Sequence, residues 1–218
     1  MNSRWQDTPA AVFLRLLADL MVVNLLTLIC SFGVITIGAS LTAMYAVLFQ
    51  RQRDEGMVNA TKTFFRAFAK NFWKATVLEL VLALLLVVAG VDFWYAAAIA
   101  QPGKTVFTVV AVIVAFLALA VFLMAFPQQA VYSNSVKNYL KNSFTLTFCA
   151  PLALLLSAAA WAALWILAYI EPEVIVRFGV LYLLWGFAFP AYATARLLSK
   201  VFEKTKPDAQ FQADPEKS

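Results

Sequence analysis

Ionisable and amide side chains inside apolar stretches are the residues of this sequence that could do chemistry. Arg15, Asp19 and Asn24 lie in the first apolar stretch, and Glu79 lies in the third. Such groups are costly in hydrocarbon, so they mark solute pathways, proton relays or bonds between helices. Arg15 and Asp19 are one helical turn apart and are expected to pair. For Asp19, Asn24 and Glu79 the spacing leaves two interpretations open, a polar pathway or interhelical hydrogen bonds.

Residue types that serve catalysis are scarce. The chain has no histidine, which removes the commonest general base and a common metal ligand. Its cysteines, Cys30 and Cys149, have no metal-ligand spacing. The sequence also lacks a phosphate-binding loop and a nucleophile paired with a base. We therefore expect a non-catalytic protein, with no cofactor and no metal site.

A second group of candidate residues is a basic segment with two opposite faces. Cations recur every four residues, at Lys62, Arg66, Lys70 and Lys74. Phenylalanines recur at the same spacing, offset by two positions, at Phe64, Phe68 and Phe72. This predicts an amphipathic helix over about 58–72, lying along the inner membrane surface with its cations among anionic lipid headgroups. Its character differs from the apolar stretch after it, which predicts a separate or sharply bent helix. A partner-docking site and a simple interfacial anchor both remain open.

The candidate residues must be positioned by the long apolar blocks of the sequence. The chain of 218 residues is 63% hydrophobic and 13% charged, whereas soluble domains are about 25% charged. Five blocks reach the roughly 20 residues that span a bilayer, and one is shorter at about 17. They lie at about 11–31, 34–50, 75–98, 105–127, 147–169 and 174–195. The blocks lack strict alternation, so we predict one all-α polytopic membrane domain, residues 1–206, with about six transmembrane helices.

Positive charges are distributed unevenly between the predicted loops. If the N-terminus is inside, Lys104 and Arg177 are the two outer members of the 17 lysine and arginine residues. Cytoplasmic segments are enriched in these residues, so both termini are expected in the cytoplasm. The net charge of +5 then reflects orientation and not nucleic-acid binding. Residues 207–218 have prolines and charges but no apolar run, which predicts a disordered cytosolic tail.

A weak internal repeat suggests how the helices are paired. The hexapeptide at 125–130 resembles the one at 188–193, and each follows an apolar block and precedes a basic run. The tetrapeptide at 68–71 likewise resembles the one at 139–142. These similarities predict three helical hairpins, with Pro127 and Pro190 kinking the helices that return inward.

Several short runs resemble the YesL family of bacterial membrane proteins. They are Asn24 to Ser31, Val34 to Ala39, Phe64 to Phe68 and Lys70 to Thr76. The resemblance implies a multi-pass protein of the bacterial plasma membrane that acts as an accessory or regulatory partner of carbohydrate ABC transporters. It implies no catalytic residues. The alternative is a small-solute channel or carrier in its own right.

Overall fold

The fold is described from a computed structural model, which describes residues 8–53, 59–170 and 172–204. These residues form helices and short connections, as the sequence predicts. The elements are α1 (Pro9–Cys30), the 3-10 helix η1 (Val34–Thr36), α2 (Ile37–Arg53), α3 (Ala60–Ala98), α4 (Gly103–Val131), α5 (Val136–Cys149), α6 (Pro151–Ile170), α7 (Pro172–Trp185) and α8 (Ala188–Lys204). The predicted tail at 207–218 lies outside the described residues.

Several helices begin at residues whose side chains cap free backbone amides. Thr8 accepts a hydrogen bond from the amide of Ala11 at the start of α1. Asn59 accepts one from the amide of Lys62 at the start of α3. Such caps satisfy the donors that a helix leaves free in its first turn, so these boundaries follow from local sequence.

Four segments are long and apolar enough to cross a membrane, namely Pro9–Cys30, Val34–Arg53, Ala60–Ala98 and Gly103–Val131. Together, α5 and the first part of α6 pass the same test, but they are bent by 101° at their junction. The described residues therefore contain four such helices by length and composition, or five if the bent pair is one span. This supports a membrane protein and falls short of the six continuous spans that the sequence predicts.

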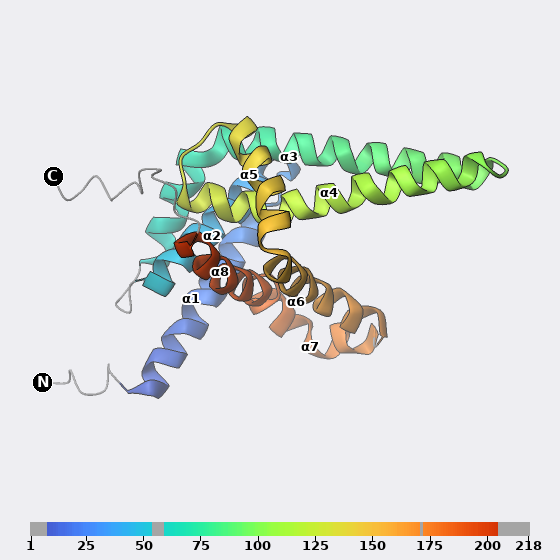
Figure 1. Cartoon of the computed structure of the whole chain (residues 1–218). Helices are drawn as coiled ribbons and strands as arrows, with labels where there is room; N and C mark the ends of the chain where they lie inside the picture. Colours follow the sequence, from blue (N-terminus) through green and yellow to red (C-terminus); the bar gives the residue numbers. More distant parts are fainter. Residues whose placement is uncertain (1–7, 54–58, 171, 205–218) are drawn as a thin grey trace, which may run out of the picture.

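The helices are arranged around α2, which contacts α1, α3, α4 and α8. Figure 1 shows α3 and α4 as a long hairpin that extends well beyond α2. It also shows α6 and α7 as a shorter pair that diverges from that hairpin. The two pairs are thus close together near α2 and splayed at their far ends.

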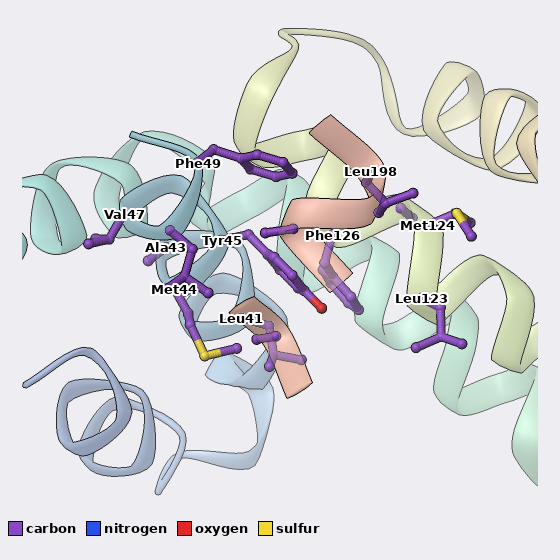
Figure 2. Packing of buried hydrophobic residues seen from close by; sticks show 14 of the residues in the cluster. Leu41, Ala43, Met44, Tyr45, Val47, Phe49, Leu123, Met124, Phe126 and Leu198 are labelled. Atoms are coloured by element: carbon purple, nitrogen blue, oxygen red, sulfur yellow. The ribbon is translucent and has the colours of Figure 1, made fainter. Parts of the chain in front are cut away.

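Side chains of α2 make the centre of the hydrophobic core. Met44, Val47 and Leu48 are almost completely buried, and Tyr45 and Phe49 are nearly so. Figure 2 shows the Tyr45 side chain pointing from α2 toward Phe126 of α4 and the ribbon of α8. A helix covered on several sides by other helices needs small or apolar residues around most of its circumference, which α2 has.

Alanines form the contact between α3 and α4. Ala89 and Ala96 on α3, and Ala111, Ala118 and Ala125 on α4, are all buried and recur every seven residues. Small residues at this spacing let two helices approach closely along a continuous seam. The large residues between them, such as Val91 and Ile113, are exposed and suit contact with lipid.

The predicted boundary before residue 75 differs from the structure. The segment expected to be a separate amphipathic helix is the first part of α3, which is one continuous helix of 39 residues. No glycine or proline interrupts residues 60–89, so nothing in the backbone stops the helix. A helix of this length extends about 58 Å, roughly twice the hydrocarbon thickness. The cationic turns can therefore stay outside the hydrocarbon without a break.

The amphipathic helix that bends sharply from its neighbour is instead α5. Its lysines, Lys137 and Lys141, are exposed, while Tyr139 and Ser143 are buried. Pro151 begins α6 directly after the bend, because proline is tolerated in a first turn but cannot continue the preceding helix. The predicted span 147–169 is therefore α6 together with the last residues of α5.

The last predicted span, 174–195, is also two helices. α7 ends at Trp185 and α8 starts at Ala188, with Gly186 and Phe187 forming a turn. A methyl group on Gly186 would lie 2.4 Å from the backbone oxygen of Tyr182, so this turn requires glycine. Pro190 therefore lies in the first turn of α8, where it fits without kinking a continuous helix.

Candidate functional site

Asp19 forms an ion pair that joins α1 to the end of α2. Its Oδ2 atom lies 3.3 Å from Nε of Arg51, and the two side chains are 26% and 9% exposed. In the described part of the chain, Asp19 pairs with Arg51 and not with Arg15, the partner that the sequence predicts. The Asp19 carboxylate neutralises the charge of Arg51, which lies in the last turn of α2. A cation in this turn is also favoured by the negative end of the helix dipole.

Asn24 ties α1 to the break between α7 and α8. It is fully buried. Its Nδ2 donates a hydrogen bond to the backbone oxygen of Leu183 at 2.7 Å. Its Oδ1 accepts hydrogen bonds from the backbone amides of Phe187 and Ala188, both at 2.9 Å. One amide side chain thus satisfies both the end of α7 and the start of α8.

A second contact holds the same break against α1. Nε1 of Trp185 donates a hydrogen bond to the backbone oxygen of Leu17 at 2.8 Å. A broken helix frees backbone groups that need partners when they are buried. Here Asn24 of α1 provides these partners, so the packing of α1 against α7 and α8 stabilises the break.

Glu79 provides a hydrogen-bond acceptor for a backbone amide at the start of α2. Its Oε2 atom accepts a hydrogen bond from the backbone amide of Gly38 at 2.9 Å. One turn earlier on α3, the hydroxyl of Thr76 donates to the backbone oxygen of Ile35 at 3.1 Å. A carboxylate at a helix N-terminus is favourable because it accepts from a free amide and faces the positive end of the dipole.

The predicted intramembrane residues are therefore divided among three separate junctions. Asp19 joins α1 to α2, Asn24 joins α1 to α7 and α8, and Glu79 joins α3 to α2. Of the two interpretations of these residues, their contacts match interhelical bonding.

The basic residues of α3 form an exposed stripe, which we call the basic face. It consists of Lys62, Arg66, Lys70 and Lys74, all exposed. Nζ of Lys74 donates to the backbone oxygen of Asn134 at 2.9 Å. This bond brings the connection between α4 and α5 beside the end of the basic face.

The aromatic side of this segment packs against protein. Phe64 is fully buried, and its ring stacks on that of Phe68 with a centroid distance of 6.3 Å. Phe68 in turn contacts Phe72 at 5.6 Å. Thr63 donates a hydrogen bond to Gln50 on α2 at 3.0 Å. The predicted two-sided character is present, but the inner side covers α2 where the sequence suggested lipid.

Two glutamines of α4 were not singled out from the sequence. Nε2 of Gln128 donates to Oγ of Ser143 on α5 at 3.0 Å. Oε1 of Gln129 accepts from the hydroxyl of Thr42 on α2 at 3.2 Å. Both glutamines are buried next to Pro127. The signal for them was the repeated hexapeptide, which was used only for pairing helices.

In the described part of the chain, no three histidine, cysteine or acidic residues are grouped in a way that could hold a metal ion. Cys30 and Cys149 are free thiols on different helices.

Comparison with known families gives one match. Residues 20–93 match the family described as "Protein of unknown function, DUF624". No curated protein and no solved structure matches the chain. The matched segment contains Asn24, Gly38, Arg51, Glu79 and the whole basic face, so it includes at least one side of each helix junction described above.

Proposed function

We propose that the protein is a non-catalytic, multi-pass protein of the bacterial cell membrane. In this proposal it acts as an accessory or regulatory partner of carbohydrate uptake through ABC-type transporters. The carbohydrate link rests on the resemblance to the YesL family. The structural observation that supports a partner role is the basic face, because its cations are exposed while Phe64 and Phe68 on the opposite side pack into the core.

The basic face would lie in the cytoplasm if both termini do, as the distribution of positive charge predicts. Anionic lipid headgroups attract such residues by about 1 kcal/mol each. A transporter subunit with an acidic cytosolic surface would be attracted by the same charges. The basic face lies on one continuous helix, α3, so binding would require little reordering of the helix.

The polar groups of the bundle give less support to a carrier. Transport needs a continuous polar path across the membrane. Asn24 and Glu79 direct polar atoms to free helix ends, and Asp19 binds Arg51. These groups are thus engaged with different helices.

The proposal is tested by affinity purification from native membranes. The wild-type protein is expected to retain transporter subunits. The triple variant Lys62→Glu, Arg66→Glu and Lys70→Glu is expected to lose them while eluting as a folded protein. Lys104→Glu is the matched control, since Lys104 is exposed in the first turn of α4, outside the basic face.

Two results would contradict the proposal. The first is a wild-type protein that retains no transporter subunit. The second is a triple variant that inserts correctly and still retains its partner, which would leave the basic face with an anchoring role.

A further inference from the structure

Two exposed tryptophans give a depth scale along α3. Trp73 and Trp94 are 78% and 74% exposed and lie 21 positions apart. At 1.5 Å per residue this separation is about 32 Å, close to the roughly 30 Å of bilayer hydrocarbon. Tryptophan is enriched at both membrane interfaces, and Lys74 of the basic face lies directly beside Trp73. Leu80 and Val88 are among the large apolar side chains exposed between the two tryptophans. The hydrocarbon therefore covers α3 from Trp73 to Trp94.

Hydrogen bonds fix the height of α2 on this scale. Near the end of α2, Oε1 of Gln50 accepts from the hydroxyl of Thr63 at 3.0 Å. Thr63 lies ten positions before Trp73, which is about 15 Å outside the hydrocarbon. At the start of α2, the amide of Gly38 donates to Glu79 at 2.9 Å. Glu79 lies six positions after Trp73, which is about 9 Å inside the hydrocarbon.

These heights show that α2 reaches less than halfway through the layer. Figure 1 agrees, since the hairpin of α3 and α4 extends well beyond α2. Moving α2 across the bilayer would carry the exposed cations of the basic face into hydrocarbon, because Gln50 and Thr63 are bonded to each other. The same movement would push the apolar end of the hairpin out into water.

The turn between α1 and α2 is the deepest part of this helix pair, and it is strongly apolar. Phe32, Val34 and Ile35 are 94%, 73% and 60% exposed. Three large apolar side chains exposed together mark a contact surface. The turn continues the apolar surface of α3, because the hydroxyl of Thr76 donates to the backbone oxygen of Ile35 at 3.1 Å.

The backbone of this turn is suited to an apolar surrounding. Irregular backbone at membrane depth needs internal partners for its polar groups. The hydroxyl of Thr36 donates to the backbone oxygen of Cys30 at 2.5 Å. The amides of Ser31 and Thr36 donate to the backbone oxygens of Thr27 and Gly33, at 2.9 and 2.7 Å. The turn can thus enter lipid without losing hydrogen bonds to water at these groups.

We propose that residues 31–36 insert into the acyl region of the leaflet next to the basic face, and that α1 and α2 return to the same side without crossing the bilayer. Lipid acyl chains are then the partner of Phe32, Val34 and Ile35. This placement goes beyond the proposed transporter role and does not depend on it. An inverted protein would lose access to a cytosolic partner, yet its turn would still lie on the side of the basic face.

Thiol labelling tests which surface the turn reaches. In a background lacking Cys30 and Cys149, Lys104→Cys is the matched control, because Lys104 lies at the far end of the hairpin, in the first turn of α4. A membrane-impermeant reagent in intact cells is expected to label Lys104→Cys and to leave Phe32→Cys at least several-fold less labelled. Six crossing helices would put both positions on one side, so equal labelling would overturn the proposal.

Fluorescence quenching in vesicles tests whether the turn is in lipid. A fluorophore on Phe32→Cys is expected to be quenched several-fold more by acyl-chain nitroxide lipids than one on Arg53→Cys, at the exposed end of α2. Iodide in the water should show the opposite order. If iodide quenches both labels equally, the turn lies in water and the proposal is wrong.

A distance between spin labels identifies the leaflet. Thr76, which is bonded to the turn, lies 18 positions before Trp94. Labels on Phe32→Cys and Trp94→Cys in vesicles should therefore be roughly 27 Å apart or more. A separation below about 15 Å, half of the hydrocarbon thickness, would place the turn in the opposite leaflet and would overturn the proposal.

Discussion

The carboxylate of Glu79 accepts a hydrogen bond from the backbone amide of Gly38 at 2.9 Å, which fixes the start of α2 against α3. Gly38 also allows this approach by lacking a side chain. A methyl group there would lie 2.8 Å from the backbone oxygen of Ala75 and from Cε1 of Phe126. The glycine and the carboxylate thus act together, because the bond forms only where the two helices are this close.

Replacing Glu79 by alanine is expected to destabilise the protein by about 1–3 kcal/mol, since the Gly38 amide loses its acceptor. Glu79→Gln keeps a carbonyl oxygen in place and should lose less stability. The measurement is denaturant unfolding of the purified protein in detergent. If both variants match the wild type in stability, the bond contributes nothing to holding α2.

The sequence predicts the helical membrane character of the chain because that character depends on local patterns. Apolar blocks and the four-residue spacing of Lys62, Arg66 and Lys70 are visible in short windows. The exposed cations opposite Phe64 follow from the same periodicity. These features need no knowledge of the tertiary fold.

The partners of the polar residues could not be predicted, because they lie far along the chain. Asn24 binds Leu183, which is 159 positions away. Asp19 has a possible partner one turn away in Arg15, and the packing of α1 on α2 brings it to Arg51. The break between α7 and α8 had a local signal in Gly186, whose lack of a side chain the turn requires. It was missed because the apolar residues around Gly186 read as one continuous span.

Replacing Asn24 by alanine should release the break between α7 and α8. The backbone amides of Phe187 and Ala188 would lose their acceptor inside the bundle, at an expected cost of about 3 kcal/mol. Hydrogen exchange should rise at these two amides more than in the middle of α4. The control is Asn71→Ala, which removes only a bond to the backbone of Ala67 one turn away. Unchanged protection at 187–188 would contradict the role assigned to Asn24.

Enlarging the alanine seam should separate α3 from α4. Ala118 is 2% exposed, so Ala118→Leu adds three carbon atoms where the helices touch. Overpacking of this kind costs about 1–3 kcal/mol. Ala83→Leu makes the same change at an exposed position of α3 and should have little effect. Equal unfolding midpoints for the two variants would show that the seam tolerates a larger side chain.

The orientation in the membrane is predicted from charge alone and can be tested directly. Arg53 ends α2 and Lys104 lies in the first turn of α4, and both are exposed. In a background lacking Cys30 and Cys149, Lys104→Cys should react with an impermeant thiol reagent in intact cells. Arg53→Cys should react only after the cells are opened, because the cationic segments are held inside. Labelling of position 53 in intact cells would contradict this orientation. It would place the basic face outside the cell, where a cytosolic transporter subunit could not reach it.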